Sequence, residues 1–103
     1  MKNTTGQRPQ ALQAHLSQKN IEIQCTFVFE DESVSYQNVF SVSMRGAQRE
    51  ITGALVDRGY VPAGRWGDVE EDQDGYRECS RTFKPGPDAK LVDITLDRLA
   101  LGD

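Results

Sequence analysis

Alternating apolar and polar positions predict a β-hairpin in the first half of the chain. Every second residue from 21 to 29 is apolar, which is typical of a strand with one buried face. A polar stretch follows at 31–33, and the segment 34–41 alternates again. We interpret these segments as two antiparallel strands joined by a turn.

The apolar spacing changes to three and four residues after Ser43, which predicts a helix over 43–58. Ser43 is a favourable N-cap, and Gly59 suits the left-handed position that ends many helices, with Tyr60 as the following apolar contact. The apolar stripe consists of Met44, Ala47, Ile51, Ala54 and Leu55. Such a stripe predicts that the helix packs against one face of a sheet.

The second half of the chain predicts two more strands, over 60–70 and 76–83. Pro62 cannot donate a ladder hydrogen bond, so the first of these strands is expected to begin at a sheet edge. Asp74-Gly75 is the strongest hairpin-turn signal in the chain. A segment rich in proline and glycine ends the second strand.

A short helix is expected over 9–20, ahead of the first strand. Pro9 suits a first helical turn, and Leu12 and Leu16 lie one helical turn apart. Asn20 can end this helix in a left-handed conformation.

The order of elements predicts an α+β domain with a four-stranded antiparallel sheet in ββαββ order and one central helix on one face. Residues 9–103 are expected to form this single domain, after a flexible N-terminal arm at 1–8. Apolar residues in 91–101 fit a strand and a helix equally well, so periodicity does not decide between them. We find no internal repeat and recognise no family.

Composition places the chain among globular proteins with one hydrophobic core. It has 103 residues, of which 37% are hydrophobic and 27% charged. The net charge of -4 argues against a protein that coats nucleic acid through clustered Lys and Arg. The chain has no apolar run long enough for a membrane span and no secretory signal, so we expect a soluble cytoplasmic protein.

The histidine and the two cysteines are not accompanied in the sequence by the other groups that a catalytic site needs. His15 is the only histidine and is expected to be solvated. Cys25 lies on the apolar parity of a strand and is interpreted as a buried thiol. Cys79 lies between Arg77 and Arg81, which would favour a thiolate, but no other catalytic group accompanies it. We predict two reduced thiols, no catalytic residue, no cofactor and no zinc site.

An acidic stretch at the turn of the second hairpin resembles the start of a calcium loop. Glu70, Asp72, Asp74 and Gly75 match its first positions, but the bidentate carboxylate expected at its end falls on Arg81. We therefore predict no metal site. The acids crowd beyond what a turn needs, and we interpret them as a partner-binding site comprising Asp68, Glu70, Glu71, Asp72 and Asp74.

Arginine residues around the only tryptophan form the second candidate site. In a hairpin closed by a short turn, Trp66 would lie opposite Arg81, which permits cation–π stacking. Arginines and aromatic residues interleaved on a sheet are typical of single-stranded nucleic-acid binders. The competing interpretation is that Trp66 packs at the core with Arg81 as its lid. The candidate residues are Arg45, Arg49, Arg65, Trp66, Arg77 and Arg81.

The leading hypothesis is a small, acidic, non-enzymatic protein-binding module, acting as a regulator, inhibitor or accessory subunit. Small acidic inhibitors from phages and mobile elements share this size and charge, although this is an analogy only. The alternative is a nucleic-acid-binding protein that uses the arginine and tryptophan surface. An enzyme that relies on carboxylates ranks third. Exposed edge strands leave a homodimer open.

Overall fold

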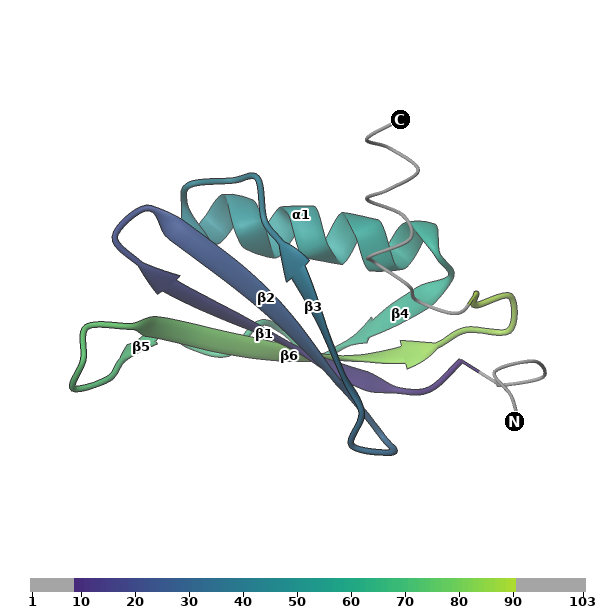
Figure 1. Cartoon of the computed structure of the whole chain (residues 1–103). Helices are drawn as coiled ribbons and strands as arrows, with labels where there is room; N and C mark the ends of the chain where they lie inside the picture. Colours follow the sequence, from purple (N-terminus) through teal and green to yellow (C-terminus); the bar gives the residue numbers. More distant parts are fainter. Residues whose placement is uncertain (1–8, 91–103) are drawn as a thin grey trace.

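A computed structural model describes residues 9–90 of the chain (Figure 1). It shows an antiparallel sheet with one helix across one face. The expected arm at 1–8 and the ambiguous segment 91–101 lie outside the described residues. The elements are β1 (Leu12–Lys19), β2 (Glu22–Phe29), β3 (Val34–Asn38), α1 (Met44–Asp57), β4 (Tyr60–Ala63), β5 (Glu70–Glu71) and β6 (Arg77–Pro85).

The α+β class and the antiparallel sheet are confirmed, but the strand count and order are wrong. The sheet has six strands, in the spatial order β3-β2-β1-β6-β4, and β5 pairs with β6 off this path. The chain therefore runs through three strands, the helix and three more strands. Central β1 and β6 pair with each other, so the last strand returns to the middle of the sheet.

The segment expected to be a short helix is instead strand β1. Leu12, Ala14 and Leu16 are buried and alternate with more accessible residues, which is the period of a strand. The helical spacing of the two leucines fits a strand equally well, and pairing with β2 and β6 decides the outcome. Asn20 does adopt a left-handed φ of 58°, but within the two-residue turn between β1 and β2.

Helix α1 forms as its capping and apolar residues predict. The Ser43 hydroxyl accepts a hydrogen bond from the Gly46 amide, and Gly59 has a φ of 88° just beyond the C-terminus. Glu50 reaches back from α1 and accepts hydrogen bonds from the Phe40 and Ser41 amides, which fixes the entry to the helix. Within residues 9–90, no helix has the length and apolar character needed to cross a membrane.

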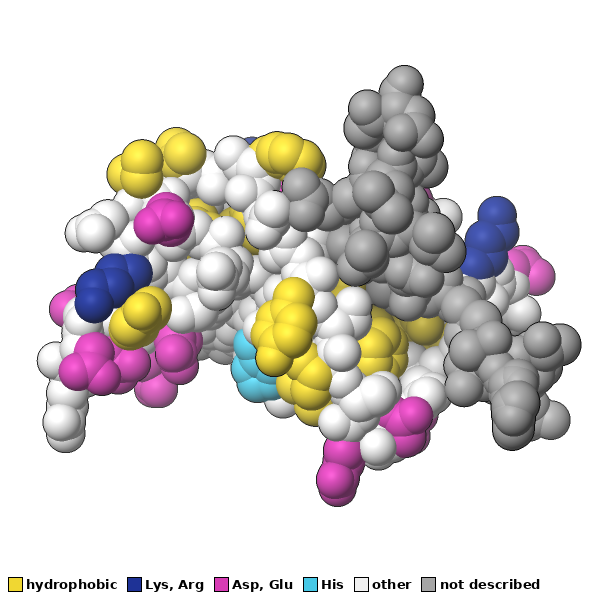
Figure 2. Space-filling view, in the orientation of Figure 1, with side chains coloured by type: hydrophobic (Ala, Val, Ile, Leu, Met, Phe, Trp, Pro, Cys, Tyr) yellow, Lys and Arg dark blue, Asp and Glu magenta, His cyan; other side chains and the backbone are white. Residues whose placement is uncertain are grey.

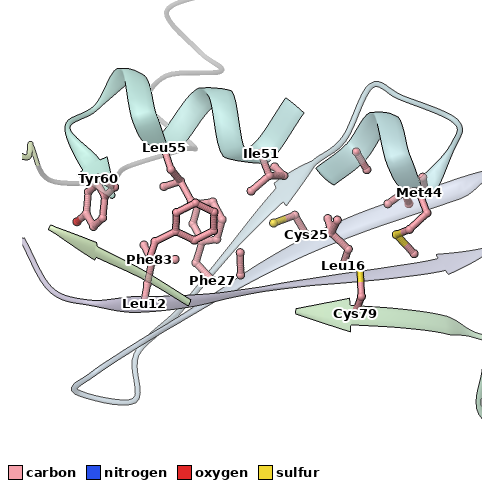
Figure 3. Packing of buried hydrophobic residues seen from close by; sticks show 13 residues of the cluster. Leu12, Leu16, Cys25, Phe27, Met44, Ile51, Leu55, Tyr60, Cys79 and Phe83 are labelled. Carbon is pink, nitrogen blue, oxygen red and sulfur yellow. The ribbon is translucent and has the colours of Figure 1, made fainter. Parts of the chain in front are cut away.

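The hydrophobic core lies between α1 and one face of the sheet (Figure 3). Phe27 and Phe83 are completely buried beneath the C-terminal half of α1, near Leu55. The buried residues on the sheet belong to one parity of β1, β2 and β6, so side chains of the other parity lie on the open face. The buried hydrophobic residues are Leu12, Ala14, Leu16, Ile23, Cys25, Phe27, Met44, Ala47, Ile51, Leu55, Tyr60, Cys79 and Phe83.

The strand expected over 60–70 is interrupted. β4 ends at Ala63, Gly64 takes a left-handed φ of 77°, and pairing resumes only at β5. The chain thereby leaves the sheet edge between 64 and 69, and Trp66 packs back against the core. The expected edge position of Pro62 is confirmed, since β4 is the last strand of the sheet order.

Loss of the Phe27 ring should test this core. We expect Phe27→Ala to lower the free energy of unfolding by about 3–5 kcal/mol, because a completely buried ring leaves a cavity. Tyr36→Ala is the matched control, since Tyr36 lies on the neighbouring strand and is 70% exposed. Its effect should stay below about 1 kcal/mol in urea denaturation. Equal losses in the two variants would contradict the assignment of the buried face.

Candidate functional site

A shallow groove of about 680 Å³ runs between α1 and the segment that leaves the sheet after β4. We call it the basic groove, because three arginines line it in a protein of net charge -4. Its lining residues are Arg45, Gln48, Arg49, Thr52, Gly53, Trp66 and Arg81.

Helix α1 supplies one wall of the basic groove. Arg45 and Arg49 lie one helical turn apart, so their side chains project from the same side of the helix. Packing of the apolar stripe on the sheet leaves both arginines exposed. In the described part of the chain, neither guanidinium group has a hydrogen bond or an ion pair. Both positive charges are therefore available to a ligand.

Arg81 of β6 supplies the third positive charge from an unusual position. It faces Ala14 across the β1–β6 pairing and shares the inward parity of Cys79 and Phe83. Its Nε and Nη2 atoms donate to the Gly64 carbonyl oxygen at 2.9 and 2.6 Å. The guanidinium also lies 5.6 Å from the centre of the Phe83 ring. These contacts hold a partly buried cation in one orientation.

Trp66 lines the basic groove and packs at the edge of the core. Its Nε1 atom donates to the Thr52 hydroxyl at 3.0 Å. Its ring meets the Phe83 ring edge-on, with centroids 6.2 Å apart. Among the described residues, the stacking of Arg81 on Trp66 that the sequence permits does not form. Arg81 lies over Phe83 instead, because the chain has left the regular hairpin at Gly64.

The structure brings together four of the six residues proposed for the arginine and tryptophan surface. Arg45, Arg49, Trp66 and Arg81 line the basic groove. Arg65 is exposed but does not line it, and Arg77 donates instead to the Gln18 side chain at 3.3 Å. Sequence reasoning missed three lining residues, which lie on α1 beside the arginines: Gln48, Thr52 and Gly53.

The proposed acidic site lies on the hairpin formed by β5, the turn and the start of β6, which we call the acidic hairpin (residues 68–78). Its carboxylates are all exposed. Glu71 faces Arg77 across the ladder, whereas Glu70 faces Glu78, and like charges opposite each other are destabilising. The five acidic residues first assigned to a partner are Asp68, Glu70, Glu71, Asp72 and Asp74.

One of these five carboxylates has a structural role that the sequence did not reveal. Asp72 Oδ1 accepts hydrogen bonds from the Asp74 and Tyr76 amides at 2.8 and 2.9 Å, which closes the turn that contains Gly75. The interpretation of the four acids other than Asp74 as surplus to the turn is therefore wrong for Asp72. No hydrogen bond engages the carboxylate of Asp74 in the described part of the chain.

A second groove, of about 420 Å³, has a mixed polar and apolar lining and was missed by sequence reasoning. Ile21, Phe40 and Val42 line it and are 71%, 75% and 66% exposed. It adjoins β3, which is one of the two edge strands of the sheet path. The sequence does not predict this surface, because exposed and buried hydrophobic residues have the same sequence pattern.

The remaining nucleophilic and titratable groups form no reactive set among residues 9–90. Both cysteines are free, as predicted, and lie on strands separated by β1. Burial raises the pKa of Cys25 to about 12. Burial also raises the pKa of Cys79, although a hydrogen bond from Gln48 and the nearby Arg77 oppose this shift. His15 lies on the open sheet face between Thr26 and Ser80.

Comparisons with protein-family models, curated proteins and solved structures find no match to this chain. Within residues 9–90, His, Cys, Asp and Glu side chains form no group of three or more that could hold a metal ion. The case for function therefore depends on the geometry and charge of the two grooves and the acidic hairpin.

The structural role of Asp72 should appear in the free energy of unfolding when Asp72 and Asp74 are each replaced by alanine. We expect Asp72→Ala to cost about 1 kcal/mol, because the turn amides lose their acceptor. Asp74→Ala removes the same charge from the same turn without removing an acceptor, so its effect should be near zero. Urea denaturation and hydrogen exchange at the Tyr76 amide measure both effects. A similar loss in both variants would refute the structural role of Asp72.

The buried Cys25 thiol should make the fold sensitive to alkali. The unfolded chain releases this proton near pH 9, whereas the folded chain holds it to about pH 12. Between pH 9 and pH 12, unfolding therefore releases a proton from Cys25. The contribution of this thiol to the free energy of unfolding is complete below pH 9 and falls as the pH rises towards 12. Between these values, the wild type should lose up to about 1.4 kcal/mol per pH unit more than Cys25→Ala. Equal losses of unfolding free energy in the wild type and in Cys25→Ala, measured by chemical denaturation across this pH range, would contradict the prediction.

Proposed function

We propose that the chain is a non-enzymatic protein-binding module whose basic groove binds the carboxylates of an acidic protein segment. One observation carries this proposal: Arg45, Arg49 and Arg81 line one groove, and no acidic side chain of the described residues neutralises them. A regulator, inhibitor or accessory subunit would use such a surface without any catalytic group.

The arrangement of the arginines suits carboxylate recognition. A guanidinium group presents a planar fork of donors that matches both oxygens of a carboxylate. Arg81 is already oriented by Gly64 and Thr52, so little side-chain entropy remains to be lost when a ligand binds. Arg45 and Arg49 are exposed and can adjust to the second carboxylate.

Two features favour a protein segment over a nucleic acid as the ligand. Base stacking needs a free aromatic face, whereas the Trp66 ring is partly buried against Phe83 and its Nε1 atom is bonded to Thr52. The acidic hairpin also continues along the same strand as Arg81, so a polyanion long enough to extend past the groove along β6 would meet repulsive carboxylates. Nucleic acid remains the second candidate, because arginines and a tryptophan do share one groove.

Trp66 allows a direct test, because it is the only tryptophan and lines the basic groove. A short oligoglutamate peptide should change its emission at low salt, with weaker binding as salt rises. Arg45→Glu with Arg49→Glu should weaken this binding about tenfold or more, because charge-assisted hydrogen bonds are lost. Lys84→Glu is the control, since it adds negative charge at an exposed strand position outside the groove.

A thymidine oligonucleotide of similar charge separates the two candidates. Tighter binding of the oligonucleotide than of the peptide, with the same dependence on Arg45 and Arg49, would favour the nucleic-acid function. If neither probe binds, or if Lys84→Glu weakens binding as much as the groove variant does, the groove is not a specific anion site and the proposal fails.

A further inference from the structure

The chain itself carries a segment whose chemistry complements the basic groove. The acidic hairpin presents exposed carboxylates on a narrow two-stranded projection at one end of the sheet (Figure 1). Acidic side chains gather at the same end in the space-filling view (Figure 2). The groove offers three positive charges, and the hairpin offers Glu70 and Asp74 in addition to its structural Asp72.

The acidic hairpin retains an electrostatic conflict that a cation would relieve. Glu70 and Glu78 are directly opposite each other in the β5–β6 ladder, where like charges are unfavourable. In the described part of the chain, neither carboxylate has an ion pair. An arginine placed against Glu70 would offset this repulsion. An ion pair between a groove arginine and Glu70 would therefore provide a partner for the arginine and relieve the like-charge pair of the hairpin.

The hairpin cannot reach the groove of its own chain. Arg81 lies in the groove, and β6 runs from it through Arg77 to the turn, so the strand direction carries the tip away from the groove. Arg77 and Arg81 are four positions apart on the strand, which corresponds to about 13 Å. No hydrogen bond or ion pair joins the two features within residues 9–90.

Separation of the basic groove from the acidic tip permits a reciprocal contact between two copies. In each copy, the basic groove and the acidic tip are separated by the same distance along β6. If a two-fold axis relates the two copies and sets one hairpin against the groove of the other, symmetry makes the second contact form as well. Such an isologous arrangement closes as a dimer and does not continue into a filament.

We propose that the acidic hairpin of a second copy occupies the basic groove, so that the chain forms a reciprocal dimer that dissociates with salt. This inference rests on the proposed function, because it names a partner for the same carboxylate-binding groove. The dimer competes with any other acidic segment, so self-association limits access of other partners to the groove.

Charge reversal in sedimentation velocity tests the dimer. The wild-type chain should dimerise at low salt and become monomeric at high salt, because screening weakens exposed charge pairs. The groove variant (Arg45→Glu with Arg49→Glu) and the hairpin variant (Glu70→Lys with Asp74→Lys) should each raise the dimer dissociation constant about tenfold or more. Lys84→Glu and Asp57→Lys are matched controls and should dimerise as the wild type does.

Mixing the two charge-reversed variants is the decisive arm. Each mixed pair brings a basic hairpin to an acidic groove and an acidic hairpin to a basic groove, so dimers should reappear only in the mixture. A wild-type chain that is monomeric at low salt overturns the inference, as does a dimer that survives both variants. If the chain binds oligoglutamate but does not form the dimer, the proposed function stands and only the dimer is refuted. If it neither binds oligoglutamate nor dimerises, both proposals are refuted.

Discussion

The inward-facing guanidinium of Arg81 constrains the structure around the basic groove. It occupies a position on β6 between two buried residues, Cys79 and Phe83, where an apolar side chain would be expected. A partly buried cation needs hydrogen bonds, and the Gly64 carbonyl supplies two of them. The left-handed Gly64 turns the chain out of β4 for this contact, and Trp66 consequently packs beside Phe83.

Packing of α1 converts this local arrangement into a site. The apolar stripe of α1 sets the rotation of the helix on the sheet, and that rotation directs Arg45 and Arg49 to the side where Trp66 and Arg81 lie. Strand β6, which carries Arg81, begins in the acidic hairpin with its group of carboxylates. The protein therefore separates opposite charges along one strand, although its net charge of -4 conceals the positive groove.

Sequence reasoning succeeded where the apolar period has only one interpretation. Strand β2 and helix α1 were predicted close to their observed bounds for this reason. It failed for β1, because Leu12 and Leu16 fit both a helix and a strand and only the pairing with β2 and β6 decides. Asn20 misled for a similar reason, since a left-handed asparagine ends helices and also closes hairpins.

The candidate site was predictable only in part. Helical spacing places Arg45 and Arg49 together, and the hairpin pattern brings Trp66 near Arg81. The contacts of Thr52 and Gly64 depend on where the chain leaves the sheet, which no local pattern encodes. The role of Asp72 required the turn geometry, and the exposure of Phe40 required the position of the sheet edge.

The most direct measurement of the central claim is an NMR titration that follows the arginine Nε–H signals of the full chain. As the protein is concentrated at low salt, the Arg45 and Arg49 signals should shift together with the backbone amides of the acidic hairpin, and Arg81 should already be protected from exchange by its bonds to Gly64. Added salt should reverse the shifts. Static arginine signals, or shifts confined to β3 and the groove beside it, would contradict the account.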